Sequence, residues 1–397
     1  MSTNSQKQKI AFILPRFLPE IAGGAEKLAL DYALILKEHY TVEIFTSCAK
    51  DYITWKNELS QGTSSWNNLL IHRFPVNKER NIQKMNQVLN DCLKKGNQVN
   101  PIEEDLFLIE QGPYLPNLVN HFIKVQSSFS LVIFVGYLYY PIVKLLPEVK
   151  IQKLIIPTFH DEPALSLPIY TRIFLPSYIY SFNAPEELNV YENQFKSKPK
   201  YDLIGTYVTI PTIKAQEINF NNTESKFNIL TMGRMEVAKG FKELFEYYHE
   251  WQKHYDTKDI NWTSIGSNHF KQNEIPDSIH IQGFVSEEEK YRFISSASLV
   301  INPSPYESFS IAMMEAWSYG VPVLVNAKSD VMRGHCDRSQ GGLYYSDELS
   351  FRRCLEYLIN HPNLCRSLGA NGKKYVQANF TKEVVGHKLL NLIKKLL

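Results

Sequence analysis

The feature that most limits the possible folds is a regular alternation of strand-like and helix-like segments along the first half of the chain. Residues 24–38, for example, carry apolar side chains at helical spacing between two apolar, β-rich runs. Strand-like runs of this kind lie at residues 9–15, 41–47, 69–75, 131–137, 153–159 and 178–182. Strands that alternate with helices are typical of a doubly wound parallel sheet, so we expect an α/β fold.

The second half repeats this alternation after a polar break at residues 209–226, which contains Pro211 and a cluster of Asn, Thr and Ser. We interpret the break as an interdomain linker. Farther along, Ser286 and Glu289 have the spacing of a capping box at a helix start. Strands are expected at 227–233, 261–267, 279–285, 299–304 and 321–327, and helices at 240–254, 286–297, 308–319, 347–360, 363–378 and 383–396.

The length of 397 residues suits two domains of roughly 150–200 residues each. We predict domain boundaries at residues 1–208 and 209–380, followed by a C-terminal helix at 381–397. In doubly wound sheets, ligands bind beyond the carboxyl ends of the strands. The loops that follow the expected strands are therefore where functional residues should be sought.

Composition excludes several classes of function. The net charge of +2 does not indicate a basic face for nucleic acid, so we expect no nucleic-acid partner. The five cysteines are an odd number at wide spacings without a CxxC pair, which favours a reducing compartment over a disulfide framework or a zinc site. The longest apolar run, at residues 131–143, is shorter than the ~20 residues of a membrane span. We therefore expect a soluble cytoplasmic protein.

The segment GRMEVAKG at residues 233–240 places two cations between an expected strand and an expected helix. Arg234 offers a bidentate fork and Lys239 a point charge, and each charge-assisted bond to a phosphate contributes ~1.5–3 kcal/mol. The alternative is a loop with two surface cations. The segment is not a Walker P-loop, because no Ser or Thr follows Lys239. No GxGxxG follows the first strand, which disfavours a dinucleotide-dependent oxidoreductase.

Two glycines, Gly23 and Gly24, separate the first expected strand from the first expected helix. Paired glycines let a backbone approach a ligand closely and expose the amides of a helix N-terminus. An ordinary flexible loop between strand and helix is the alternative.

Glu307 and Glu315 stand eight positions apart around an expected helix start near Ser308. Eight helical residues rise ~12 Å, which matches the span from a hexose across a diphosphate to a ribose. The amides between them, at the positive end of the helix dipole, favour a diphosphate. Alternatively, Glu307 is a helix-start acid and Glu315 a solvated residue. Against this, the neighbours of Glu315 are apolar, and a carboxylate among them needs a partner: Met313, Met314, Ala316 and Trp317.

These motifs together resemble the retaining GT-B glycosyltransferases of family 4 over nearly the whole chain. The resemblance lies in E-x7-E (Glu307 to Glu315), R-x4-K-G (from Arg234), GGAE (residues 23–26) and TFHDEP (residues 158–163). It implies two Rossmann-like domains that face a central cleft. The first would present the acceptor and the second would bind a nucleotide sugar. The last helix would pack back towards the first domain.

The resemblance also implies a role for each matching residue. Arg234 and Lys239 would bind the donor diphosphate and stabilise the leaving group. Glu315 would bind the ribose, and Glu307 the hydroxyls of the donor sugar. His160 would lie near the reacting centre, although an interior structural histidine is the alternative. The implied donor-binding residues are Gly23, Gly24, Gly233, Arg234, Lys239, Glu307, Ser308, Phe309, Ser310, Ile311 and Glu315, and the implied catalytic residues are His160, Arg234, Lys239 and Glu307.

One position departs from the family pattern, because Ser310 stands where many members have glycine. This puts the identity of the donor sugar in question. No D-x-D occurs in the sequence, so we expect no divalent cation and no cofactor. The implied acceptor is a glycan or a lipid-linked glycan, as in polysaccharide biosynthesis. A sugar-nucleotide epimerase, a phosphorylase and a non-catalytic sugar-nucleotide or glycan-binding subunit remain alternatives.

Two further segments can be interpreted from their composition. Residues 334–345, GHCDRSQGGLYY, indicate a polar connecting loop followed by a short strand. The C-terminal residues 387–397 are basic and amphipathic. They either touch an anionic membrane surface, at the inner face of the membrane, or form the helix that packs across both domains, which we favour.

Overall fold

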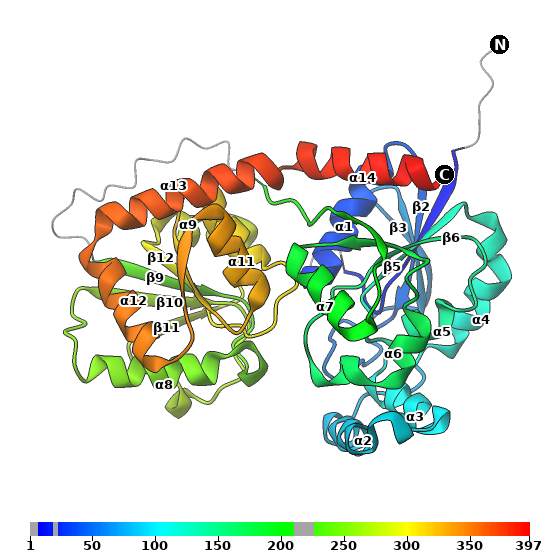
Figure 1. The fold of residues 1–397 in the computed structure, drawn as a ribbon, viewed down its shortest axis with the longest axis horizontal. Helices are drawn as coiled ribbons and strands as arrows, with labels where there is room; N and C mark the ends of the chain where they lie inside the picture. Colours follow the sequence, from blue (N-terminus) through cyan, green and yellow to red (C-terminus); the bar gives the residue numbers. More distant parts are fainter. Residues whose placement is uncertain (1–6, 19–22, 210–225) are drawn as a thin grey trace, which may run out of the picture. The chain divides into compact units, whose positions relative to one another are not determined.

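The computed structural model describes residues 7–18, 23–209 and 226–397. These form two compact units (Figure 1). Unit 1 comprises Met1–Thr206 and Gly386–Leu397, and unit 2 comprises Tyr207–Val385. The interdomain linker predicted at 209–226 lies outside the described residues except for its two ends.

The sheet of unit 1 has the strand order β3-β4-β2-β1-β5-β6-β7-β8. Neighbouring strands are parallel, except that β3 pairs antiparallel with β4. The central strands β1 and β5 are almost entirely buried, as expected for parallel strands covered on both faces. The strands are β1 (Lys9–Ile13), β2 (Thr41–Ser47), β3 (Gly62–Trp66), β4 (Leu69–Phe74), β5 (Leu131–Val135), β6 (Gln152–Ile156), β7 (Ile179–Phe182) and β8 (Lys200–Leu203).

Helices cover both faces of this sheet. One face packs against a large aromatic core to which α4, α5 and α7 contribute, including Phe122, Ile142 and Tyr191. Proline begins several of the helices, where its missing N–H costs nothing. The helices of unit 1 are α1 (Gly24–Leu36), α2 (Ile82–Lys95), α3 (Pro101–Gln111), α4 (Pro116–Val125), α5 (Tyr140–Leu145), α6 (Pro168–Ile173) and α7 (Pro185–Phe195).

The sheet of unit 2 has the order β11-β10-β9-β12-β13-β14, with parallel pairing throughout. Both units are therefore doubly wound α/β structures, which confirms the predicted fold class. The strands are β9 (Phe227–Met232), β10 (Ile260–Ile265), β11 (Ile279–Gly283), β12 (Leu299–Asn302), β13 (Val323–Asn326) and β14 (Gly342–Tyr345).

The helices of unit 2 form a layer on each side of its sheet. In Figure 1, α9, α11 and α13 lie on one side and α8 on the other. The predicted capping box is confirmed, because the Ser286 hydroxyl accepts from the Glu289 N–H and the Glu289 carboxylate accepts from the Ser286 N–H. The helices are α8 (Phe241–Gln252), α9 (Glu287–Ser296), α10 (Ile311–Ser318), α11 (Asp330–Ser339), α12 (Glu348–Asn360), α13 (Pro362–Asn379) and α14 (Lys382–Leu396).

The C-terminal helix α14 begins in unit 2, and its residues from Gly386 onwards belong to unit 1. There it lies beside α1, because a Cβ placed on Gly386 would meet the Ile35 side chain at 3.8 Å. Lys395 lies 3.8 Å from the Asp202 carboxylate of β8. Among the described residues, no helix combines the length and the apolar character needed to cross a bilayer.

The loop expected at residues 334–345 is wrong, because this segment forms most of α11 and the strand β14. The Ser329 hydroxyl caps α11 by accepting from the Met332 N–H at 3.3 Å. Val331, Met332 and Cys336 are buried along one face of the helix. The segment is rich in polar residues, so its helical pattern was not recognised from the sequence. The helix is amphipathic, and its N-cap residue, Ser329, lies five residues before the segment.

Candidate functional site

The loop after β9 carries Arg234 and Lys239 and is fixed by close backbone packing. Gly240 has a left-handed φ of 77° and begins α8. A Cβ on this glycine would lie 2.1 Å from the carbonyl oxygen of Pro303. Only glycine fits such an approach, and the contact brings the loop after β9 against the loop after β12.

Lys239 and Glu307, 68 positions apart in sequence, meet at this junction. The Lys239 ammonium group donates to Glu307 Oε1 at 2.9 Å and to the Ser304 hydroxyl at 3.5 Å. The Lys239 and Glu307 side chains are 30% and 19% exposed. The pair is thus partly shielded yet open to solvent, so that polar groups of a ligand can replace Lys239 or Glu307 as the other's partner.

Arg234 lies two residues after the end of β9 and has a side chain that is 38% exposed. Its guanidinium group lies 3.6 Å from the Glu236 carboxylate. The carboxyl edge of the unit 2 sheet therefore presents two half-exposed cations, Arg234 and Lys239, on one short loop. Such a pair can bind an anion with two negative groups.

The loop after β12 differs from the prediction in one respect. Helix α10 begins at Ile311 rather than near Ser308, so Glu307 and Glu315 do not stand on one continuous helix. The cause is Ser310, which has φ 68° and ψ 77°, a region that favours glycine. Its hydroxyl accepts from the Asn302 amide at 2.9 Å, which holds the turn. Of the four predicted amide positions, Ser308, Phe309 and Ser310 precede the helix and Ile311 is its first residue.

Phe309 anchors this loop to the core of unit 2. Its ring is buried and packs edge-on against His335 and Phe380, with centroid distances of 5.6 and 4.9 Å. Burial lowers the pKa of His335 to about 3, so its imidazole is neutral at physiological pH. His335 lies on α11, the helix that the sequence did not reveal. Phe309 is therefore a structural anchor of the loop that carries Glu307.

Glu315 lies on α10 and has the partner that its apolar neighbourhood required. The Lys290 ammonium group of α9 donates to Glu315 Oε1 at 2.8 Å and to Glu287 Oε1 at 2.9 Å. The Lys290 and Glu315 side chains are 18% and 13% exposed. Sequence reasoning missed Lys290, because nothing in a charged helix start marks a contact with a residue 25 positions later.

Gly23 and Gly24 lie in unit 1 at the start of α1. A Cβ on Gly23 would meet the Glu26 carboxylate at 2.0 Å, whereas one on Gly24 would meet nothing within 4 Å. Glu26 forms a largely buried ion pair with Arg16 at 2.6 Å. The close approach at Gly23 thus accommodates this ion pair, which the sequence did not indicate. The preceding residues of the predicted loop, 21 and 22, are outside the described residues.

His160 also lies in unit 1, on the turn after β6. Thr158 in this turn has a φ of 53°, which is rare for a β-branched residue. The turn is held by Glu187, whose fully buried carboxylate accepts from the N–H groups of Phe159 at 2.9 Å and Asn183 at 2.7 Å. Burial raises the pKa of Glu187 to about 8, although the backbone bonds act in the opposite direction. A buried carboxylate therefore fixes the turn that positions His160.

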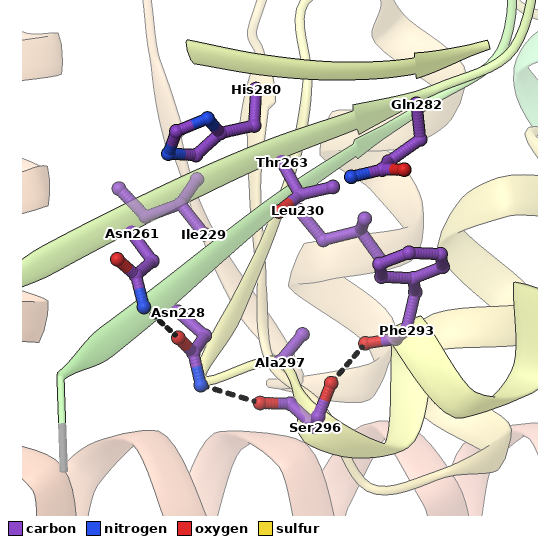
Figure 2. A pocket seen from close by; sticks show the side chains of 10 residues that line it. All are labelled: Asn228, Ile229, Leu230, Asn261, Thr263, His280, Gln282, Phe293, Ser296 and Ala297. Carbon is purple, nitrogen blue, oxygen red and sulfur yellow. Dashed lines mark hydrogen bonds between the residues drawn. The ribbon is translucent and has the colours of Figure 1, made fainter. Parts of the chain in front are cut away.

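A cavity of about 350 Å³ lies elsewhere, over β9, β10 and β11 beside the end of α9 (Figure 2). Asn261 donates to Asn228, which donates to the Ser296 carbonyl. None of the predicted site residues lines this cavity. In the residues that the structure describes, no group of three or more His, Cys, Asp or Glu side chains is arranged to hold a metal ion.

Part of the sequence is similar to known proteins. Residues 213–375 match the family model described as glycosyl transferases group 1. Over 126 residues the chain is 28% identical to MMP alpha-(1->4)-mannosyltransferase of Mycolicibacterium hassiacum, a match that spans 30% of this chain and 30% of that relative.

The fold is similar to several solved structures. Sucrose-phosphate synthase from Thermosynechococcus elongatus superimposes with a TM-score of 0.69 and 17% identity, over 98% of this chain and 99% of that one. HepE of Anabaena, solved in complex with UDP and glucose, gives a TM-score of 0.66 and 12% identity, over 98% and 99% of the two chains. Both units thus have the GT-B architecture of these structures, and the match to the glycosyl transferases group 1 model extends over residues 213–375.

Proposed function

We propose that the chain is a retaining glycosyltransferase that moves a sugar from a nucleotide-diphosphate sugar to a glycan or a lipid-linked glycan. The observation that carries this proposal is the ion pair between Lys239 and Glu307 at the carboxyl edge of the unit 2 sheet, on a loop that also carries Arg234. Two cations and a carboxylate at this edge suit a diphosphate and the hydroxyl groups of the sugar attached to it. The family of residues 213–375 supports the same class of reaction.

In the proposed donor complex, the diphosphate displaces Glu307 from Lys239. The ammonium group and the Arg234 guanidinium group then bind phosphate oxygens, and Glu307 becomes available to sugar hydroxyls. Glu315 accepts hydrogen bonds from the ribose. Charge that develops on the leaving diphosphate is stabilised by cations that are already in place, which is the most effective form of electrostatic catalysis.

The reaction breaks the bond between the anomeric carbon and the diphosphate oxygen. The acceptor hydroxyl oxygen bonds to the anomeric carbon from the same face, and its proton passes to a departing phosphate oxygen. Configuration is thereby retained without an enzyme nucleophile. Arg234 and Lys239 supply the positive charge, so we propose that no divalent cation is required.

His160 and the Gly23–Gly24 loop belong to unit 1, for which we propose the acceptor-binding role. The ordered turn at Thr158 gives His160 a defined position within unit 1, and its catalytic role is part of the proposal. All five cysteines are free thiols, which supports our placement of the protein in the cytoplasm. A lipid-linked acceptor would bring it to the inner face of the membrane.

The proposal is tested by incubating the protein with UDP-, GDP-, ADP- and dTDP-sugars and measuring nucleoside diphosphate release, with and without candidate glycan acceptors and with EDTA. We expect one donor class to react, acceptor to accelerate the release, EDTA to have no effect, and proton NMR to show retained anomeric configuration. An epimerase would convert the sugar nucleotide without acceptor. A non-catalytic binding subunit would bind the nucleotide but release none.

A further inference from the structure

The ion pair between Lys290 and Glu315 joins two helices, α9 and α10, on the same face of the unit 2 sheet. Lys290 Nζ lies 2.8 Å from Glu315 Oε1. The same ammonium group lies 2.9 Å from Glu287, whose side chain is 67% exposed. Lys290 thus bridges one shielded carboxylate and one solvated carboxylate.

The electrostatics of this bridge favour two charged partners. Burial lowers the pKa of Lys290, but the charge of Glu315 and the hydrogen bonds to Glu315 and Glu287 more than reverse this, so the pKa lies above its ordinary value. Without the ammonium group, Glu315 would lose this charge-assisted hydrogen bond, and the Glu287 carboxylate that binds the same ammonium group would lose its partner too.

Two tyrosines frame the pair. The ring of Tyr291 stacks on that of Tyr319 with centroids 5.7 Å apart, and Lys290 Nζ lies 5.2 Å from the Tyr291 ring centre. These contacts restrict the lysine side chain, so its ammonium group is fixed relative to α10. The Glu315 carboxylate has about four lone-pair sites, and the lysine bond leaves capacity for further donors.

We propose that Lys290 is a positioning residue for the ribose end of the donor site. Its ammonium group holds the Glu315 carboxylate charged and oriented, so that the carboxylate can accept hydrogen bonds from the 2′ and 3′ hydroxyls of a ribonucleotide. This inference rests on the proposed function, and it adds a residue that no sequence motif marks. Lys290 acts through Glu315 and does not itself touch the ribose.

Calorimetric titration with UDP, GDP and ADP and with their 2′,3′-dideoxy forms tests this inference. The proteins are the native chain, Lys290→Met, Lys290→Arg and Glu315→Gln. Lys253→Met is the matched control, because Lys253 is a half-exposed lysine in unit 2 that forms an ion pair with Glu250 and belongs to no part of the site.

We expect the native chain to bind the preferred ribonucleotide about tenfold more tightly than its dideoxy form, the effect of one charge-assisted hydrogen bond. Lys290→Met should remove most of this difference while changing the affinity for the dideoxy form less than about twofold. Lys290→Arg should restore discrimination. Lys253→Met should match the native chain.

An equal loss of affinity for both forms, or no loss for either, would overturn the inference while leaving the proposed function intact. If no nucleotide binds the native chain, the proposed function fails and the inference fails with it.

Misfolding is controlled by the double variant Lys290→Met with Glu315→Gln, which removes the shielded carboxylate together with its lysine. If Lys290 acts through Glu315, the double variant discriminates no less than Glu315→Gln alone, because coupled residues are not additive. A further loss in the double variant would show that Lys290 contacts the nucleotide directly, which would also overturn the inference.

Discussion

The two units have the same fold class, yet they use their acidic side chains differently. In unit 2, Glu307 and Glu315 are partly exposed and bonded to lysines that a ligand can also reach. In unit 1, Glu104, Glu110 and Glu187 are fully buried and bonded to arginine, lysine or backbone groups. The comparison supports our proposal that the carboxylates of unit 2 exchange their partners with a ligand, whereas the buried carboxylates of unit 1 hold the fold.

The largest expected effect is on catalysis in unit 2. Lys239→Met should lower kcat/KM for the sugar nucleotide by about 10²–10³, the loss typical of one removed group that stabilises transition-state charge. Unfolding temperature should change little, because a partly exposed ion pair contributes only about 0–1 kcal/mol. Lys253→Met is the control. Equal activity of the two variants would show that Lys239 has no catalytic role.

Two glycine substitutions, one in each unit, should differ in their effect on stability. Gly240→Ala should destabilise unit 2 by several kcal/mol, because the new Cβ would lie 2.1 Å from the Pro303 carbonyl oxygen at a φ of 77°. Gly24→Ala should change the free energy of unfolding by less than about 1 kcal/mol, since its Cβ meets nothing and its backbone is helical. Denaturant unfolding measures both, and equal losses would contradict the assigned close approach.

Glu187→Gln tests the structural role of a unit 1 carboxylate. The amide has one acceptor oxygen for two N–H groups, so we expect a loss of about 1–3 kcal/mol in the free energy of unfolding. Nucleotide affinity should stay unchanged, in contrast to the Lys239 variant. Loss of nucleotide binding without loss of stability would reverse the roles given to the two units.

The stability cost of Glu187→Gln should also depend on pH. The pKa of Glu187 rises from an ordinary value of 4.5 to about 8 in the folded chain. The folded state therefore binds more protons than the unfolded state between these values, and the contribution of Glu187 to stability falls as pH rises. The cost of Glu187→Gln should be largest near pH 4.5 and smallest above pH 8. Urea unfolding of both proteins across this range measures the difference, and a constant cost would contradict the assigned pKa.

Sequence patterns predicted both sheets because buried parallel strands are nearly continuous apolar runs. Strand β3 was not predicted, since Gly62–Trp66 is polar and exposed and exists only through its antiparallel pairing with β4. The start of α10 was misplaced because the left-handed turn at Ser310 depends on a hydrogen bond from Asn302. Such signals depend on contacts between distant segments and leave no periodicity in the sequence.

The candidate site likewise contains residues that the sequence predicted and residues that it did not. Arg234, Lys239 and Glu307 could be predicted because the loops after parallel strands meet at one edge of a sheet, and Glu315 because its apolar neighbours in the sequence required a partner. Lys290, Arg16 and Glu187 were missed, because each acts on a residue far away in sequence. The close approach that admits only glycine at Gly240 could not be derived either, since it depends on the position of Pro303.

The central claim is that the carboxyl edge of the unit 2 sheet binds the diphosphate of a nucleotide sugar. Its most direct test is calorimetric titration of UDP, GDP, ADP and dTDP, without added metal, into the native chain, Lys239→Ala and Lys253→Ala. The account predicts that one nucleotide binds the native chain and Lys253→Ala equally, and binds Lys239→Ala about tenfold or more weakly, the effect of one lost charge-assisted bond. Binding of none of the four, with or without Mg²⁺, or equal binding by all three proteins, would contradict it.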